Sequence, residues 1–213
     1  MSQVTTGLYR LVGNPRIYMM IQNLLGGPRA RRVLVDELMR PPPDGRVLDL
    51  GCGTADILHS IGGIVGGYVG IDANPRHIRA ARQTHRGRGE FICGDFAEAA
   101  GLPPEGFDLV LMIGLLHHLS DPQAGEAVRL AGRLMTPNGR LFTIDPCRTE
   151  PQHPVARFLI GRDSGRAVRT EPGYRALARA AFDQVESVVR RDILRVPYTH
   201  CIMNCRRRSS APG

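Results

Sequence analysis

Short apolar runs that alternate with helix-like stretches are the feature that most constrains the fold of this chain. The runs lie at residues 46–50, 68–72, 90–93, 107–113 and 139–144. Short apolar strands separated by helices are typical of a parallel sheet that is covered on both faces. The sequence therefore predicts an α/β fold built as a doubly wound sheet.

The two ends of the chain depart from this alternation. Residues 8–27 and 28–40 are typical of two helices, the second of which begins at a proline. Residues 182–193 and 198–207 are two strand-like segments, which we expect to pair as a hairpin. Residues 146–174 are rich in Pro, Gly and Arg, and we expect a long irregular excursion there. Excursions after a strand of an open α/β sheet commonly carry the substrate site.

The net charge of +8, from 28 basic and 20 acidic residues, indicates anionic partners. Part of this charge is the run Arg206–Arg208, which we expect to be a solvated terminus. Because the chain has no tryptophan and few aromatic residues among its basic ones, specific binding of nucleic acid is not favoured.

The five cysteines are scattered and form no CxxC motif, so we expect buried, reduced thiols and no metal site. No apolar run approaches the roughly 18 residues that a membrane span requires. The first sixteen residues lack the pattern of a secretory signal. We therefore expect a cytoplasmic protein without a membrane span.

The segment VLDLGCGTAD, residues 47–56, places a glycine turn between two acids. Asp49 ends the first strand, Gly51 and Gly53 form the turn, and Asp56 enters the next helix. A pyrophosphate at this turn would need a third glycine and a helix N-terminus without negative charge. The two acids would repel a diphosphate, but they suit a ligand that presents an ammonium or sulfonium group.

Two further acids end the next two strands. Asp72 follows Gly53 by nineteen residues, where an acid can accept both ribose hydroxyls of a nucleoside. Asp95, in FICGDF, is placed to accept a hydrogen bond from an exocyclic adenine amine, and Phe96 could pack against the adenine ring. Taken singly, Asp49 or Asp95 could be an ordinary turn acid. A nucleoside with an amino-acid tail and no phosphates is S-adenosylmethionine.

At these residues the chain resembles the class I S-adenosylmethionine-dependent methyltransferases of the small-molecule type. The likeness lies in VLDLGCGTAD, VGIDANP, GDF, FDLVLMIGLLHHL and LMTPNGRLFTIDP, in the order and spacing of the family. It covers residues 46–146 and the final hairpin. It implies a Rossmann-like sheet of seven strands, the last of them antiparallel, with a helical N-terminal lid.

The resemblance divides the 213 residues into the parts of a single methyltransferase domain. These are a helical lid (1–40), a cofactor-binding core (46–146), a substrate-side excursion (147–180) and a terminal hairpin (181–208). Ala55 stands where many members have glycine, a change that we expect to cost little. The residues implied to bind S-adenosylmethionine are Asp49, Gly51, Gly53, Asp56, Asp72, Ala73, Asp95, Phe96 and Ile113.

Candidate catalytic residues follow the fourth and fifth strands. His117 and His118 come after the fourth strand, and Asp145 ends the fifth. In methyl transfer the protein positions the acceptor and, for an oxygen or nitrogen nucleophile, removes a proton. A histidine oriented by a carboxylate is a reasonable base for a hydroxyl acceptor. We favour His117 as the base and expect His118 to pack as a helix cap, although both could be structural.

The excursion supplies arginines that could hold an anionic acceptor, because guanidinium forks suit carboxylate and phosphate groups. The residues that we expect to bind the acceptor are Arg148, Arg162, Arg169, Tyr18 of the lid, and Tyr198 and His200 at the last strand. The predicted function is methyl transfer to a small, anionic acceptor, with O-methylation favoured, by a monomer or homodimer.

Two alternatives stay open: an RNA methyltransferase, and a protein that binds S-adenosylmethionine without catalysis. The Asn-Pro-Pro-Tyr type of motif found in enzymes that methylate amino groups of nucleic acids is replaced here by MIGLLHHL. Cys147 invites comparison with the nucleophile of RNA cytosine-5 enzymes. Those enzymes also carry a Pro-Cys pair after the fourth strand, and this chain does not.

Overall fold

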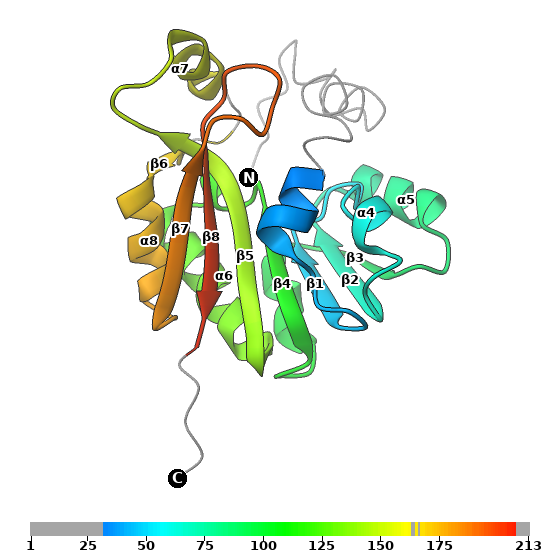
Figure 1. Cartoon of the computed structure of the whole chain (residues 1–213). Helices are drawn as coiled ribbons and strands as arrows, with labels where there is room; N and C mark the ends of the chain where they lie inside the picture. Colours follow the sequence, from blue (N-terminus) through cyan, green and yellow to red (C-terminus); the bar gives the residue numbers. More distant parts are fainter. Residues whose placement is uncertain (1–31, 163–164, 166, 208–213) are drawn as a thin grey trace.

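The computed structural model describes residues 32–162, 165 and 167–207, and it contains a twisted sheet with helices on both faces (Figure 1). The seven main strands lie in the order β3-β2-β1-β4-β5-β8-β7, and β8 runs antiparallel to both of its neighbours. A two-residue strand, β6 (Arg169–Thr170), pairs with the end of β5. The predicted fold class is confirmed. The main strands are β1 (Arg46–Leu50), β2 (Gly67–Asp72), β3 (Glu90–Cys93), β4 (Phe107–Ile113), β5 (Met135–Arg148), β7 (Gln184–Arg190) and β8 (His200–Arg206).

Alternating side chains of the strands enter two separate hydrophobic cores. In β1, Val47 packs into one core, and Leu48 and Leu50 pack into the other. The helical segment η1 (Val33–Met39) and the helices α4 (Leu58–Ile61) and α5 (Pro75–Thr84) cover the first core. The second core is covered by α6 (Asp121–Leu134), α8 (Glu171–Arg179) and the short helix η2 (Phe96–Gly101).

Local capping fixes where two of these helices begin. Asn74 caps α5 by accepting a hydrogen bond of 3.0 Å from the N–H of Arg76, and the first residue of the helix is a proline. Ser120 and Gln123 form a capping box at the start of α6. Because α6 begins directly after the short helix η3 (Leu116–His118), its cap also anchors the turn that carries the two adjacent histidines.

The described residues of the stretch 146–174 contain all or part of two helices and two strands, which the predicted irregular excursion did not include. Strand β5 continues to Arg148, α7 (Pro154–Gly161) follows, and β6 leads into α8. A proline stands in the first turn of both helices. Proline is favoured there because its fixed φ suits a helix and its missing N–H would have no partner in the helix. Prolines are also typical of turns, which is why the sequence pattern indicated a loop here.

Residues 1–31 of the predicted lid, Tyr18 among them, lie outside the described residues. Four of the five free cysteines are buried as expected, but Cys93 is exposed. The C-terminal arginine run is not simply solvated, because Arg207 donates to the carbonyl of Met135 over 2.6 Å. In the part of the chain that the structure describes, no helix has the length and apolar character of a membrane span.

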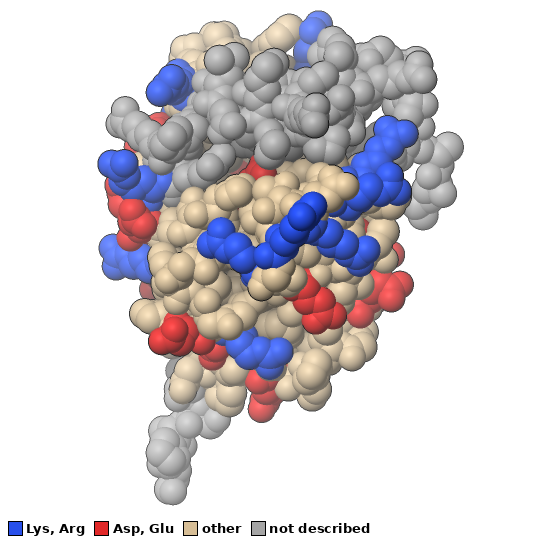
Figure 2. Space-filling model, turned by 90° about the vertical axis from the view of Figure 1, so that its right-hand side faces the viewer, with Lys and Arg blue, Asp and Glu red and all other residues tan. Residues whose placement is uncertain are grey.

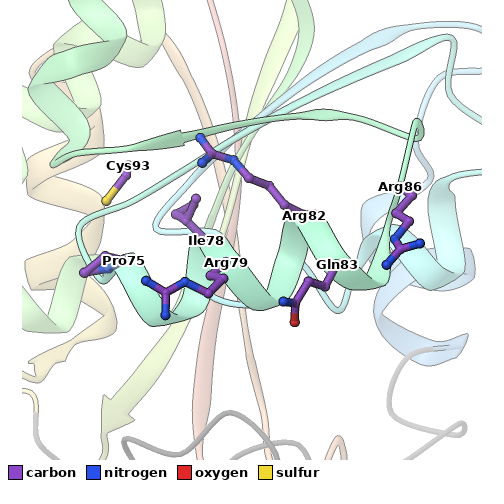
Figure 3. Close-up of a pocket in the computed structure, with 7 residues that line it drawn as sticks. All are labelled: Pro75, Ile78, Arg79, Arg82, Gln83, Arg86 and Cys93. Atoms are coloured by element: carbon purple, nitrogen blue, oxygen red, sulfur yellow. The ribbon is translucent and has the colours of Figure 1, made fainter.

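Positive charge gathers on α5 and the turn after it. Residues 75–89 contain five arginines and no acid, and Figure 2 shows arginine side chains crossing this side of the molecule. A hollow of about 320 Å³ lies along the helix (Figure 3). Its lining consists of Pro75, Ile78, Arg79, Arg82, Gln83, Arg86 and Cys93.

Candidate functional site

The glycine turn after β1 is tied to the end of β2 by backbone hydrogen bonds. Gly51 and Gly53 have φ angles of +76° and +56°, which favour glycine. The N–H of Gly51 donates to the carbonyl of Ile71 over 2.8 Å, and the N–H of Gly53 donates to Oδ2 of Asp72 over 2.9 Å. A Cβ atom on Gly51 would lie 3.0 Å from Cδ1 of Leu115. The turn therefore packs directly against the segment that follows β4.

Ala55 completes the turn in a left-handed conformation, with φ of +57°, and is fully buried. For a residue with a Cβ atom, this conformation costs about 1–2 kcal/mol. The expectation that alanine in place of glycine costs little was therefore wrong. Asp56 is half-buried in the turn just before α4.

Asp72 is held as a carboxylate by the groups around it. Its Oδ1 accepts from the N–H of Asn74 over 2.8 Å and lies 3.3 Å from Nδ1 of His77. Partial burial alone would raise the pKa of Asp72, but the bonds from His77, Asn74 and Gly53 outweigh it and lower the pKa. Asp72 thus stays charged at neutral pH at the edge where β1 and β2 end.

Asp49 is the opposite case. Its side chain is buried, and Oδ2 accepts a hydrogen bond of 2.7 Å from the hydroxyl of Tyr68. The other oxygen, Oδ1, is buried without a hydrogen-bond partner. Burial raises the pKa of Asp49 to about 7, although the bond from Tyr68 opposes the shift. A buried, half-satisfied carboxyl group of this kind favours a cationic ligand beside it.

The remaining predicted cofactor residues lie at the same edge of the sheet. The carbonyl of Asp72 accepts from the N–H of Gly94 over 3.1 Å, which brings the segment after β3 next to β2. Asp95 is exposed and caps η2 by accepting from the N–H of Ala97 over 2.7 Å. By making this bond, Asp95 acts as an ordinary turn acid, the alternative role that the sequence left open for it. Ala73 is exposed, and Phe96 and Ile113 are half-buried.

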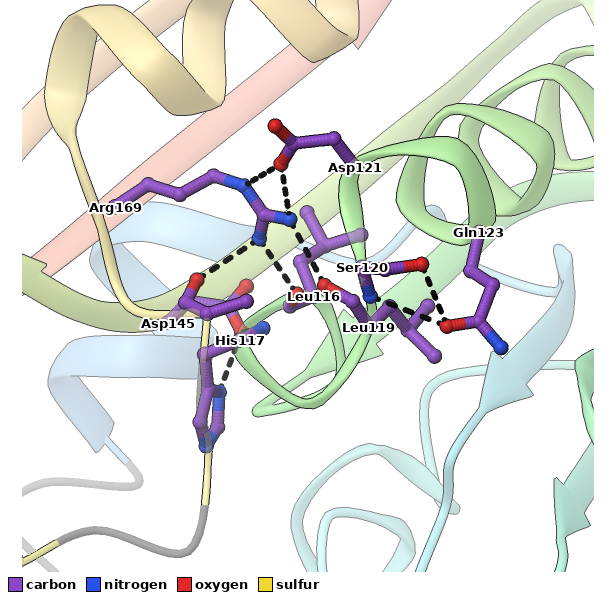
Figure 4. A network of polar contacts seen from close by, with 9 residues as sticks. Leu116, His117, Leu119, Ser120, Asp121, Gln123, Asp145 and Arg169 are labelled. Carbon is purple, nitrogen blue, oxygen red and sulfur yellow. Dashed lines mark hydrogen bonds and ion pairs between the residues drawn. The ribbon is translucent and has the colours of Figure 1, made fainter. Parts of the chain in front are cut away.

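His117 and Asp145 form a buried pair where β4 and β5 end (Figure 4). Oδ1 of Asp145 lies 2.8 Å from Nδ1 of His117 and also accepts from the backbone N–H of His117 over 3.1 Å. The other oxygen of Asp145, Oδ2, is buried without a hydrogen-bond partner. The carboxylate therefore fixes both the backbone and the ring of His117.

His118 lies differently from the expectation. It is exposed, and its ring stacks on that of His117 with 4.0 Å between the centroids. A packed, capping role for His118 is therefore wrong, because the buried histidine of the pair is His117. In a helical turn of three residues, neighbouring side chains point in different directions, and only one of the two can face Asp145.

His200, the first residue of β8, and Tyr198, two residues before it, approach the same pair. His200 lies opposite Pro146, the residue after Asp145, and its ring lies 5.0 Å from that of Tyr198. Burial lowers the pKa of His200 to about 4, with a further contribution from the charge of His117. His200 is therefore neutral at physiological pH, and its Nδ1 is buried without a hydrogen-bond partner.

The predicted arginines do not gather at this pair as acceptor ligands. Arg169 donates all of its five N–H groups within the chain: two to Asp121, and three to the carbonyls of Leu116, Leu119 and Ala167 (Figure 4). It has no donor left for an acceptor, which corrects the predicted role. Arg148 is exposed at the end of β5. Arg162 is also exposed, and its guanidinium lies 4.3 Å from the ring of Phe158.

Sequence reasoning missed the partner of Asp49. Tyr68 is a tyrosine in an otherwise aliphatic buried strand, and a buried hydroxyl needs a hydrogen-bond partner. That signal was available in the sequence. Asp121 and Gly165 had no comparable signal, because their contacts are to residues far away in the chain.

Comparison with known proteins agrees with this architecture. A family model described as a methyltransferase domain matches residues 47–139. The ubiquinone biosynthesis O-methyltransferase of Parvibaculum lavamentivorans is 29% identical over 128 residues, which cover 59% of this chain and 49% of that protein. The probable tRNA methyltransferase 9B of Homo sapiens is 31% identical over 118 residues, which cover 54% of this chain and 23% of that protein. The chain spans about half the length of the first curated relatives it matches.

Among solved structures, a methyltransferase of Haloferax volcanii in complex with the Trm112 methyltransferase activator has the same fold, with a TM-score of 0.68 at 18% identity. The match covers 96% of this chain and 100% of that one. Residues 47–139 are thus similar to a methyltransferase domain, and the described chain shares its fold with solved methyltransferase structures. The matched family and a structural neighbour from Leishmania major, described as a SAM-dependent methyltransferase, imply S-adenosylmethionine as the cofactor.

The residues at the glycine turn fit that cofactor. The unpartnered Oδ1 of Asp49 suits its ammonium group, and the charged Asp72 suits its ribose hydroxyls. Gly53 faces open space that a ligand could occupy, because a Cβ atom there would meet nothing within 4 Å. Within the described residues, no group of three or more His, Cys, Asp or Glu side chains is arranged to hold a metal ion.

We expect Asp72→Ala to weaken the binding of S-adenosylhomocysteine by about 1.5–3 kcal/mol, the usual loss for hydrogen bonds to a charged group. Isothermal titration calorimetry measures this directly. Glu90→Gln, at an exposed position on β3, is the control and should bind like the parent. Tighter binding of NAD than of S-adenosylhomocysteine by the parent would contradict the family assignment.

Asp49 makes the binding of S-adenosylhomocysteine depend on pH. With a pKa of about 7, it is increasingly protonated below neutral pH, so affinity should fall by up to about tenfold per pH unit below pH 7. Asp49→Asn should weaken binding above pH 7 and remove the dependence. Tyr68→Phe, which removes the bond that lowers this pKa, should move the dependence to higher pH.

The same shift predicts a change in stability. Because the pKa is raised in the folded state, Asp49 lowers stability as the pH rises from about 4 to 7. Without ligand, Asp49→Asn should therefore melt at a higher temperature than the parent at pH 8. A flat pH profile for binding in the parent would refute this role of Asp49.

Proposed function

We propose that this methyltransferase transfers a methyl group to a hydroxyl oxygen of a small acceptor that carries a carboxylate or phosphate group. The observation that carries the proposal is the buried pair of His117 and Asp145, held at 2.8 Å. Leu115, two residues before His117, packs on Gly51 of the glycine turn. The pair thus lies next to the part of the site that suits the cofactor.

The pair has the arrangement of a general base and its orienting acid. With the carboxylate at Nδ1, that nitrogen carries the proton, and Nε2 is left as the acceptor. Nε2 can then take the proton of the acceptor hydroxyl as its oxygen attacks. S-adenosylmethionine, when bound, supplies the methyl group on a sulfonium. His200, which is neutral at physiological pH, adds no positive charge that would compete for the proton.

An acceptor with an anionic group is supported by the arginines around this edge. Arg148 is exposed three residues after Asp145, and Arg162 is exposed at the end of α7. An exposed guanidinium can bind a carboxylate or phosphate by two parallel hydrogen bonds. We further propose that the protein works in the cytoplasm as a monomer or homodimer.

The experiment is an acceptor screen that measures the release of S-adenosylhomocysteine. Suitable probes are 3,4-dihydroxybenzoate, which joins hydroxyls to a carboxylate, a sugar phosphate, and bulk tRNA. Release with either small probe, and a methylated product in the mass spectrum, supports the proposal. Cofactor binding without release for any probe or for a cell extract would favour the non-catalytic alternative.

On an acceptor found in this way, we expect His117→Ala to lower kcat by about 10²–10⁴, the contribution of one general base. The Kd for S-adenosylhomocysteine should not change, because the residues at the glycine turn are untouched. His118→Ala, at an exposed position, should retain most of the activity. If His117→Ala keeps near-full turnover, the ring is structural and positioning of the acceptor suffices.

RNA is the second candidate acceptor, and the arginine hollow along α5 is the observation that favours it. Arg79, Arg82 and Arg86 are exposed along one side of the helix, and guanidinium groups bind phosphates well (Figure 3). The likeness to a probable tRNA methyltransferase of Homo sapiens points the same way. The hollow lacks aromatic side chains on which bases could stack, so it suits the RNA backbone rather than its sequence.

We expect weak RNA binding that depends steeply on salt and is indifferent to sequence. Fluorescence anisotropy with two 20-nucleotide RNAs of different sequence measures it. If RNA lies on α5, Arg79→Gln with Arg86→Gln should flatten the slope of log K against log salt by about 1.4, or about 0.7 per lost phosphate contact. Arg157→Gln, on α7, is the matched control. Tight, sequence-selective binding at physiological salt would promote RNA above the small acceptor.

A further inference from the structure

The segment formed by Gly165 and residues 167–170 contacts both the strand that carries Asp145 and the turn that carries His117. At one end, β6 pairs with β5, with Arg169 opposite Cys147. Tyr174, just beyond, donates its hydroxyl to the carbonyl of Pro146 over 2.9 Å. This end is thus attached to β5 within two residues of Asp145.

The other end of the segment lies on His117 itself. The N–H of Ala167 donates to the carbonyl of His117 over 3.0 Å. Gly165 packs against the imidazole so closely that a Cβ atom would lie 2.0 Å from Cδ2 and 2.9 Å from Cγ of His117. Such distances do not occur between real atoms, so any side chain at position 165 must displace the ring or the segment.

Arg169 ties the segment to the whole turn after β4. Its Nη1 donates to the carbonyl of Leu116 over 2.8 Å, and its Nη2 donates to that of Leu119 over 2.8 Å. Nε and Nη2 both donate to Oδ1 of Asp121, over 2.9 and 2.7 Å. The arginine side chain is only 10% exposed. These contacts bracket His117 and His118 on both sides along the chain (Figure 4).

We propose that Gly165 and Arg169 are positioning residues that set the His117 ring against Asp145 for proton removal. This inference rests on the proposed function of His117 as the base. Neither residue touches the acceptor in this role. Because Gly165 has no side chain, it leaves room for the imidazole ring of His117. Arg169 holds the turn after β4 in the position in which Nδ1 of His117 contacts the carboxylate of Asp145. A lysine at position 169 has three donors in place of five and no planar fork, so it cannot hold all four acceptor atoms.

The first test reads the ring directly and needs no acceptor. In proton–carbon NMR, the His117 ring signals are assigned by their loss in His117→Gln. Gly165→Ala and Arg169→Lys should each move these signals and change their pH titration, whereas the Kd for S-adenosylhomocysteine should stay within about twofold of the parent. Gly161→Ala, at a glycine with open space around it, and Arg157→Lys are the matched controls. Unchanged ring signals in both positioning variants would overturn the inference.

The second test separates this inference from the proposed function. On an identified acceptor, kcat should fall at least about tenfold in Gly165→Ala and Arg169→Lys, with KM within about twofold and a shifted pH–rate profile. If His117→Ala is slow but both variants keep the parent's kcat, the positioning role is wrong and the base assignment survives. If His117→Ala is as fast as the parent while the ring signals still move, the proposed function fails and the geometric role of the segment survives. Thermal melting shows whether each variant is folded.

Discussion

The hydrogen bonds that a single carboxylate oxygen accepts from His117 organise the acceptor side of this protein. Oδ1 of Asp145 accepts from both the backbone and the ring of that residue. Asp145 lies opposite Cys201 of β8 and directly follows Ile144, the last residue of β5 that pairs with β4. The position of the ring is therefore set by a residue of the central sheet, which suits the proposed role of His117 as a general base.

Asp49 and Asp72, the two acids near the glycine turn, have opposite pKa shifts because their surroundings differ. Asp72 receives backbone N–H groups and stays charged, whereas Asp49 receives one hydroxyl and has a pKa raised to about 7. Asp72, which is already charged, can accept hydrogen bonds from a ligand without a change in its protonation. The buried one is stabilised only when positive charge arrives, so it makes cofactor binding sensitive to the charge of the ligand.

The cofactor side could be predicted from sequence because its signals are local. Glycines with positive φ, and acids at the ends of successive strands, occur at short and regular spacings, and the fold brings strand ends together at one edge. The roles of Arg169 and Gly165 could not be predicted in this way. Arg169 binds carbonyl groups that lie about 50 residues away in the chain, and such a contact leaves no pattern in the sequence. From the sequence alone, a structural arginine of this kind cannot be distinguished from one that binds a ligand. The prolines of the stretch 146–174 misled for a related reason, since proline starts helices as well as interrupting them.

The distribution of arginine bears on the choice between acceptors. Arg169 donates its hydrogen bonds to backbone carbonyls and to Asp121. Fewer arginines near His117 and Asp145 are therefore available to bind an anionic acceptor than the sequence indicated. The densest group of exposed arginines lies instead along α5, beside the edge strand β3. Strand β3 lies three strand spacings from β4, the strand that precedes His117, and at about 4.8 Å per spacing this is about 14 Å. A small acceptor cannot reach both regions at once, whereas a polyanion of a few nucleotides can. Whether charge on α5 affects turnover therefore separates a small acceptor from RNA, independently of which atom receives the methyl group.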